Sequence, residues 1–135
     1  MEIILDADVL IRGEKGTFEL AGWLVSRGAD SFGVAAITVA ELWHGVERAT
    51  TKHRAKREHY LRAILGTLPI IPYTEQTACM HAQLWAALQS AGKMIGYYDI
   101  IVAATALEAG CAVATFNRRH FAVVPGLNVM EPSFE

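Results

Sequence analysis

Three acidic residues of this chain lie beside apolar segments in a way that suggests a cation site. Asp6 directly follows the apolar run IIL, Glu41 lies within AAITVAELW, and Asp99 opens the segment DIIVAATAL. A carboxylate beside buried apolar residues is costly to desolvate unless a cation or a hydrogen-bond donor lies next to it. Carboxylate oxygens are the ligands that hard divalent cations prefer. The three residues therefore predict an oxygen-rich metal site, and Asp8, two positions after Asp6, is a further candidate ligand.

Each of these acidic residues also fits an ordinary structural role. Asp8 can turn the chain out of a strand, and Asp99 is stabilised by the positive end of a helix dipole. Thr38 and Glu41 fit the S/T-x-x-E capping box, although the apolar surroundings of Glu41 favour a side chain turned inward. Taken one at a time, these residues leave both roles open. Their shared position at predicted strand ends and helix starts favours convergence on one cation.

Short apolar runs alternate with longer helical patterns along the chain. We expect strands at residues 2–6, 32–37, 70–71, 111–115 and 127–130. We expect helices at residues 18–26, from 38 onward, and at 51–66, 74–92 and 99–109. Strands that alternate with helices form a parallel sheet covered on both faces, with ligands at the carboxyl ends of the strands. The predicted fold class is therefore α/β, and that edge is expected to hold Asp6, Thr115 and Asn117.

Length and charge limit the class of protein further. A chain of 135 residues is expected to form a single domain over residues 1–135. Apolar residues make up 53% of the chain, above the usual range of about 45 to 50%, so part of the apolar surface is expected to serve a partner. A net charge of -2 argues against a protein that coats nucleic acid with its whole surface.

Half of the 12 Lys and Arg residues nevertheless fall within one short segment. A solvent-exposed helix face explains such a run, and so does a contact to phosphate or to an acidic partner. The six residues of this basic cluster are Arg48, Lys52, Arg54, Lys56, Arg57 and Arg62.

Several other classes of protein are disfavoured. No apolar run approaches the roughly 18 residues of a membrane span, and acidic residues near the N-terminus do not suit a signal peptide, so we expect a cytoplasmic protein. Cys79 and Cys111 lack CxxC spacing and are expected to be buried thiols. The five histidines form no His-x-x-x-His zinc pair. The loops and elbows that mark dinucleotide-binding proteins, nucleotide triphosphatases and serine hydrolases are not found in the sequence.

Four segments in order carry a resemblance to one known family: LDADVLI, ITVAELWHGVE, GYYDIIVAATALEAG and TFNRRHFAVVPGLNV. They span nearly the whole chain and resemble the PIN-domain family, specifically its VapC-type ribonuclease toxins. The resemblance implies a PIN-like fold with a central parallel sheet flanked by helices on both faces. It also implies an acidic pocket formed by Asp6, Glu41 and Asp99. Asn117 matches a fourth position of that pocket, and Thr115 matches a hydroxyl that holds the pocket or a water.

Two positions depart from the usual pattern of this family. Asp8 stands where members often carry Asn or Ser, which adds negative charge beside the site. Asn117 is a neutral and weaker ligand than an acid, so a single metal ion is the simpler expectation. His120 lies at a variable position and receives no role.

The resemblance implies hydrolysis of an RNA phosphodiester with Mg²⁺ or Mn²⁺, which leaves a 5′-phosphate. A cation held by Asp6 and Asp99, with Glu41 bound directly or through water, would acidify a water molecule and offset phosphate charge. Octahedral Mg²⁺ usually keeps several waters, so few protein ligands suffice.

Candidate contacts to RNA are Tyr97, Tyr98 and Arg118. Aromatic faces stack on unpaired bases, although a pair of tyrosines is more often part of the packing. The resemblance further implies the toxin half of a toxin–antitoxin pair, with a small antitoxin protein and a second copy of the chain as partners.

Other functions share parts of this pattern. The segment IILDADVL also fits haloacid dehalogenase phosphatases, but the later motifs of that family do not follow in order. A receiver domain needs an acidic residue after its middle strand, and residues 67–73 contain none. Two alternatives stay open, a PIN-domain nuclease of RNA processing without a toxin role and a catalytically weak binding module with the same fold.

Overall fold

The computed structural model describes residues 1–134 and is built around one parallel sheet. Its strands are β1 (Glu2–Leu5), β2 (Ser31–Ala35), β3 (Ile70–Ile71), β4 (Ala112–Ala114) and β5 (Val129–Met130). Its helices are α1 (Ala7–Lys15), α2 (Leu20–Ser26), α3 (Ala36–Arg48), α4 (Thr51–Leu65), α5 (Glu75–Ala91), α6 (Tyr97–Ala109) and α7 (Arg118–Ala122). All paired strands are parallel, which confirms the predicted α/β class.

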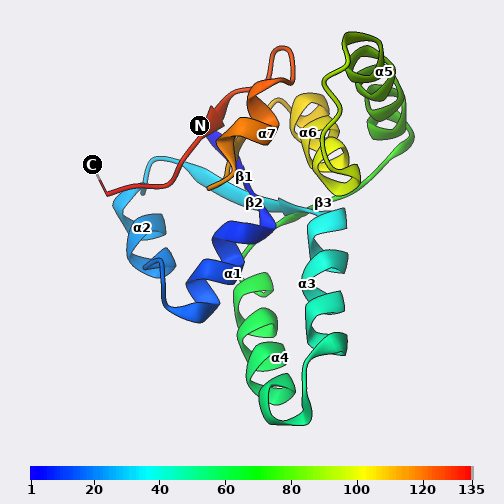
Figure 1. Cartoon of the computed structure of the whole chain (residues 1–135). Coiled ribbons are helices and arrows are strands. Elements are labelled where there is room, and N and C mark those ends of the chain that lie inside the picture. Colours follow the sequence, from blue (N-terminus) through cyan, green and yellow to red (C-terminus); the bar gives the residue numbers. More distant parts are fainter. Residues whose placement is uncertain (135) are drawn as a thin grey trace.

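The strand order β3-β2-β1-β4-β5 leaves a switch point at the centre of the sheet. The chain moves outward from β1 to β2 and β3, then returns to the other side of β1 for β4 and β5 (Figure 1). In β1, Ile3 pairs with Phe32 on one side and with Ala112 on the other. Where neighbouring strands connect in opposite directions, a crevice forms beyond their carboxyl ends. Asp6 and Thr115, the residues that follow β1 and β4, therefore lie at this crevice.

Helices cover both faces of the sheet because successive strand residues point to opposite sides (Figure 1). Ile4 belongs to the apolar cluster formed with α5, α6 and α7, which includes Leu88 and Phe121. Its neighbours Ile3 and Leu5 belong to the opposite cluster with α1 and α2. The strands are thus buried on both sides, as expected of a parallel sheet.

Helix α6 is the central helix of its face. Residues 100–106 are all buried, since the sheet lies on one side of α6 and α5 on the other. Figure 1 shows the connection between α5 and α6 running back along the helices, so that both helices start at the same end of the molecule. This arrangement places the first turn of α6, with Asp99, near the carboxyl edge of the sheet. Among residues 1–134, no helix is both long and apolar enough to span a membrane.

Several local expectations from the sequence are wrong. The chain does not continue as a strand past Asp6, because Asp6 caps α1 instead. Helix α3 begins at Ala36 without a side-chain cap, and Thr38 is fully buried, so the capping box does not form. Helix α6 starts two residues earlier than expected, and α7 was not predicted. Cys79 is exposed rather than buried.

Candidate metal centre

Asp6 is held in place by hydrogen bonds to both oxygens of its carboxylate. It leaves β1 in an extended conformation, and its Oδ1 accepts a hydrogen bond of 2.9 Å from the backbone N–H of Ala7. Its Oδ2 accepts a hydrogen bond of 2.9 Å from the Thr115 hydroxyl. Only 7% of Asp6 is exposed. The end of β1 and the end of β4 are therefore tied together through this one carboxylate.

Thr115 and Asp8 join α1 to the loop that follows β4. The Thr115 hydroxyl accepts a hydrogen bond of 2.9 Å from the backbone N–H of Asn117 and lies 3.2 Å from Asp8 Oδ2. The same Asp8 oxygen accepts a hydrogen bond of 3.0 Å from the backbone N–H of Phe116. Asp8 lies near Asp6 because the helix and the loop bring them both to Thr115, rather than through a shared strand geometry. Its carboxylate is largely satisfied by the protein itself.

Glu41 lies in α3, half-buried and facing the other carboxylates. It has no hydrogen-bond partner within residues 1–134. Burial, together with the negative charges of Asp6 and Asp99, raises the pKa of Glu41 from 4.5 to about 7. The structure therefore settles the two alternatives for Glu41 in favour of the inward orientation.

The pKa of Asp6 shows the same concentration of negative charge. The pKa of Asp6 is raised from 3.8 to about 6, because burial and the charges of Asp8 and Asp99 raise it by more than the hydrogen bonds from Thr115 and Ala7 lower it. No cationic side chain contributes to either of these two pKa values. Carboxylates grouped without a compensating positive charge favour either protonation or a bound cation.

Asp99 lies in the first turn of α6 and belongs to the same group, since its charge raises the pKa of both Asp6 and Glu41. Its Oδ2 is 3.3 Å from Nδ1 of His120 in α7, which makes an ion pair when the ring is charged. The same ring nitrogen is 2.8 Å from the side-chain nitrogen of Asn117. Asn117 therefore contacts the centre through His120 and not through a carboxylate.

The donor set fits a hydrated divalent cation better than a bare one. Within residues 1–134, no three Asp, Glu, His or Cys side chains are close enough to enclose an ion by themselves. Mg²⁺ usually binds through one or two carboxylates and keeps its remaining waters. Thr38, one turn before Glu41 on the same side of α3, has a buried hydroxyl without a partner in the described chain. Such a hydroxyl is a suitable partner for an ordered water.

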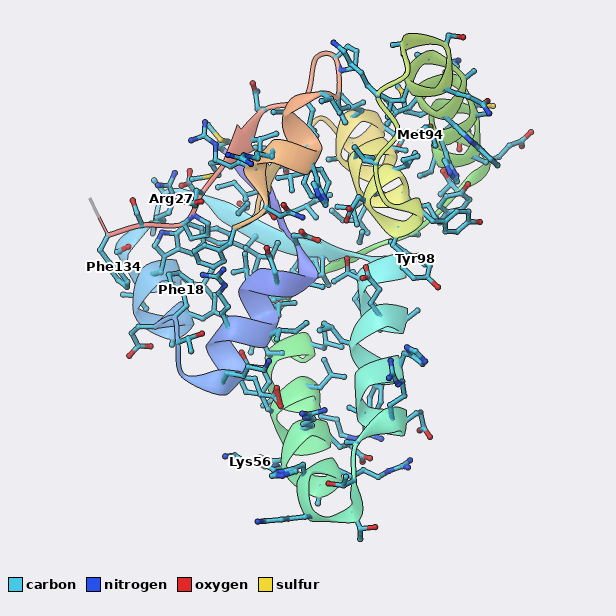
Figure 2. The ribbon with its side chains drawn as sticks, viewed as in Figure 1. Phe18, Arg27, Lys56, Met94, Tyr98 and Phe134 are labelled. Atoms are coloured by element: carbon cyan, nitrogen blue, oxygen red, sulfur yellow. The ribbon has the colours of Figure 1, made fainter. Side chains whose placement is uncertain are left out.

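The two candidate aromatic residues lie at the rim of this centre. Tyr97 is 63% exposed and Tyr98 is 50% exposed, with their rings edge to face at 5.6 Å. Figure 2 shows Tyr98 at the start of α6, beside the first turn of α3. Tyr97 also meets His81 of α5, which stacks on Trp85. Arg118, the first residue of α7, is exposed on the same loop as Asn117.

The basic cluster lies on α4 and at the end of α3, away from the carboxylates (Figure 2). Arg54 pairs with Glu47, Arg57 with Glu14 and Arg62 with Glu58. Half of the cluster is thus neutralised by acidic side chains, mostly on the protein surface. A solvent-exposed face accounts for these three, while Arg48, Lys52 and Lys56 have no ion pair within the described residues.

The sequence pointed to the carboxylates and Thr115 but gave no role to His120. A single histidine in a loop carries no spacing signal, and the contact with Asp99 joins residues 21 positions apart. Only the packing of α7 against α6 reveals this contact.

The fold is an α/β fold whose acidic side chains gather at the switch point of the sheet, where ligands of such folds bind. The chain belongs to the PIN-domain family, whose model matches residues 3–127. It is 30% identical over 138 residues to the VapC ribonuclease Y4jK of Sinorhizobium fredii, covering 96% of each chain. It is 29% identical over 96 residues to the tRNA(fMet)-specific endonuclease VapC of Salmonella typhimurium, covering 71% of each.

Solved structures show the same fold. A structure of VapBC2 from Rickettsia felis bound to a promoter DNA fragment superposes with a TM-score of 0.90 at 20% identity, covering 98% of this chain and 100% of the other. A toxin–antitoxin complex from Klebsiella pneumoniae superposes with a TM-score of 0.69 at 25% identity, covering 97% and 98%. These likenesses confirm the predicted resemblance to VapC-type PIN domains.

Proposed function

We propose that this chain is a divalent-metal-dependent endoribonuclease, the toxin of a VapBC-type toxin–antitoxin module, formed by a single PIN domain. The observation that carries the proposal is the group of Asp6, Glu41 and Asp99 at the switch point of the sheet, in which each negative charge raises the pKa of Asp6 or Glu41. The names of the related VapC ribonucleases support RNA as the substrate. We propose the cytoplasm as the place of action, because RNA is made and translated there.

Asp6, Asp99 and Glu41 are the proposed holders of one Mg²⁺ or Mn²⁺, with Asp8 as a further candidate. The chemistry that such an ion supplies is activation of water and neutralisation of phosphate charge. Thr115 keeps the Asp6 carboxylate oriented, since its hydroxyl donates to Oδ2. Asp8 has a second task, because its bond to Phe116 holds the β4 loop against α1.

Glu41 is the side chain best suited to accept a proton from the attacking water. Its carboxylate has no hydrogen-bond partner in the described chain, whereas both oxygens of Asp6 are engaged. A pKa of about 7 lets it exist as a base near neutral pH. A water held by Glu41 and placed in line with the scissile bond would leave a 5′-phosphate on one product.

Tyr97, Tyr98 and Arg118 are proposed to contact the RNA strand. The exposed tyrosine rings offer faces for unpaired bases next to Asp99, and stacking on such rings tolerates any base. Arg118, exposed at the start of α7, offers a charged donor for phosphate. Asn117 is proposed to act through His120, which it contacts.

An antitoxin is the proposed protein partner, together with a second copy of the chain. A largely apolar groove of ≈ 230 Å³ lies between α1, α3 and α4 and extends to Glu41. Its lining includes Leu10, Leu42 and Leu61. An antitoxin segment in this groove would reach the carboxylates, and the toxin–antitoxin complex from Klebsiella pneumoniae supports this kind of partner.

The proposal is tested by RNA cleavage with purified protein. A labelled initiator tRNA, chosen from the name of the Salmonella relative, is incubated with Mg²⁺, Mn²⁺ or EDTA alongside total tRNA. We expect cutting that requires metal and that falls at least about 100-fold in Asp99→Asn, because loss of even an outer partner of a metal costs about 10- to 100-fold. Asp6→Ala excludes a contaminating nuclease.

Two results would contradict the proposal. Cleavage that persists in EDTA would remove the metal from the mechanism. Failure of the folded protein to cut any RNA, although it binds Mn²⁺, would favour the binding module over the enzyme.

A further inference from the structure

His120 occupies an unusual position for a basic side chain, directly against a carboxylate of an otherwise acidic centre. Its Nδ1 is 2.8 Å from the side-chain nitrogen of Asn117 and 3.3 Å from Asp99 Oδ2. Within residues 1–134 it is the only side chain that brings a nitrogen into hydrogen-bond contact with Asp6, Asp8, Glu41 or Asp99. The ring is nonetheless 53% exposed. One edge of the ring therefore faces the centre while the other faces solvent.

The contacts of Nδ1 determine whether the outward-facing Nε2 of His120 carries a proton and can donate a hydrogen bond. In the neutral ring, Nδ1 accepts a hydrogen bond from the Asn117 amide nitrogen in the orientation that the structure gives this amide, and the ring proton then lies on Nε2. A charged ring carries a proton on Nε2 as well. Nε2 has no hydrogen-bond partner within the described part of the chain. His120 thus presents an oriented N–H donor to solvent at the rim of the centre.

A hydrogen-bond donor at the rim of an acidic centre reduces the electrostatic repulsion between the centre and RNA. Phosphate groups are repelled by the carboxylates, and hydrogen bonds to charged oxygens from fixed donors counter that repulsion. Asp99 and Asn117 restrict the ring from two elements, α6 and the β4–α7 loop, so little rotamer freedom is left to lose on binding.

We propose that His120 is a substrate-binding residue, whose Nε2–H donates to a phosphate oxygen of the RNA strand next to the metal centre. This inference rests on the proposed function, since it takes RNA to be the substrate. The role belongs to the outer nitrogen of the ring, whereas Nδ1 only fixes its direction.

Substitution of His120 by each of the two amide residues tests the roles of Nδ1 and Nε2 separately. In His120→Asn the side-chain amide reaches about as far as Nδ1, so the contact to Asn117 and Asp99 is kept and the outer donor is lost. In His120→Gln the amide reaches about as far as Nε2 and restores an outer donor. His120→Ala removes both. Arg119→Gln is the matched control, because it removes a charge from the same helix at a residue with no hydrogen bond to the centre.

The experiment measures binding separately from cleavage. Each substitution is combined with Asp6→Asn, which is expected to stop cutting, and a short fluorescein-labelled single-stranded RNA of mixed sequence is titrated by anisotropy. Affinity for Mn²⁺ is measured for each single variant by calorimetry without RNA. Cutting of tRNA by the unaltered protein is followed in parallel.

We expect His120→Ala and His120→Asn to weaken RNA binding about 10-fold or more, as for loss of one hydrogen bond to a charged group. His120→Gln and Arg119→Gln are expected to stay within about three-fold of the Asp6→Asn parent. The Mn²⁺ affinity is expected to change little in His120→Asn.

Three results would overturn the inference. RNA affinity that is unchanged in His120→Ala would show that Nε2 does not contact RNA. Equal losses in the asparagine and glutamine variants, accompanied by weaker Mn²⁺ binding, would show that His120 only positions Asp99. Failure of the Asp6→Asn parent to bind the RNA would also overturn the inference. If the unaltered protein binds RNA through His120 but never cuts it, the proposed function fails while this inference stands.

Discussion

The Asp6 side chain combines a structural task with a functional one. Its Oδ1 caps α1, and its Oδ2 holds Thr115 at the end of β4. Those two bonds orient a carboxylate that burial and neighbouring negative charges make unfavourable in its ionised form, since its pKa rises to about 6. In the protein without metal, the ionised Asp6 carboxylate therefore lowers the free energy of unfolding.

This instability predicts a pH dependence for the metal-free protein. The pKa of Asp6 is raised from 3.8 to about 6 in the folded state, and that of Glu41 from 4.5 to about 7. Well below pH 3.8, the ordinary pKa of Asp6, both groups are protonated whether the chain is folded or not. As the pH rises, the folded state holds these protons longer, so the free energy of unfolding falls between about pH 4 and pH 7. Urea unfolding in EDTA at several pH values measures this fall.

Asp6→Asn is expected to stabilise the metal-free protein at pH above 7. Asparagine caps a helix about as well as aspartate, and it carries no charge to desolvate. A shift from 3.8 to about 6 corresponds to at most about 3 kcal/mol, at about 1.4 kcal/mol per unit. Adding Mn²⁺ should raise the melting temperature of the unaltered protein and leave that of Asp6→Asn unchanged. A variant less stable than its parent in EDTA would refute this account of Asp6.

At the scale of elements, the centre depends on how the β4–α7 loop is attached to β1 and α1. Thr115 is fully buried, donates to Asp6 and accepts from the backbone of Asn117. A single hydroxyl therefore sets both the orientation of a carboxylate and the path of the loop that leads to His120.

Thr115→Val is expected to cost about 1 to 3 kcal/mol of stability, because it leaves a buried carboxylate oxygen and a backbone N–H without their partner. It should also reduce cleavage strongly, since Asp6 loses its orientation. Chemical unfolding and RNA cleavage measure the two effects. Thr105→Val is the matched control, because the equally buried Thr105 hydroxyl bonds only a carbonyl of its own helix. Equal behaviour of the two variants would contradict the role given to Thr115.

The start of α6 supplies a second test at this scale. A Cβ at Gly96 would come within 2.9 Å of Asp99 Oδ2, while the backbone there suits any residue. The Asp99 carboxylate can swing away, so Gly96→Ala should leave stability nearly unchanged and lower the affinity for Mn²⁺ about 10-fold. Calorimetric titration with Mn²⁺ checks this. Gly45→Ala in α3, where a Cβ meets no atom, should bind Mn²⁺ normally.

At the scale of the whole molecule, one sheet joins two apolar clusters, and the acidic and basic side chains lie in different regions. The carboxylates gather at the switch point, while the basic cluster lies along α4 and at the end of α3. Three of its members are neutralised by acidic side chains. Arg48, Lys52 and Lys56, which have no ion pair within the described residues, are therefore the part of this cluster best able to attract RNA or an acidic partner.

Replacing Lys52 and Lys56 together by Gln should weaken RNA binding and lower the steepness of its salt dependence by about one to two charges. The measurement is RNA affinity across a series of salt concentrations. Arg62→Gln serves as the control, since Arg62 is paired with Glu58 and should change the salt dependence less. An unchanged salt dependence in the double variant would assign these lysines to the solvent-exposed face alone.

Much of the fold was predictable because hydrophobic periodicity is a local property. The apolar runs around Ile4 and Val113 and the long helix capped by Thr74 lie where expected. Predictions from local patterns were wrong where a short polar segment is compatible with two different local structures. Asp6 caps a helix that the apolar pattern did not indicate, and Thr38 is buried although its spacing to Glu41 matches a cap.

By itself, the sequence determined the fold class, the family and the types of side chain that gather at the carboxyl edge, because these follow from periodicity and motif order along the chain. Only the tertiary structure decided how those side chains act on one another. The raised pKa of Glu41, the hydrogen bond from Thr115 to Asp6 and the contact between His120 and Asp99 all depend on residues that are distant in sequence. Desolvation and charge interactions depend on distances through space, and those distances exist only once the helices are packed on the sheet.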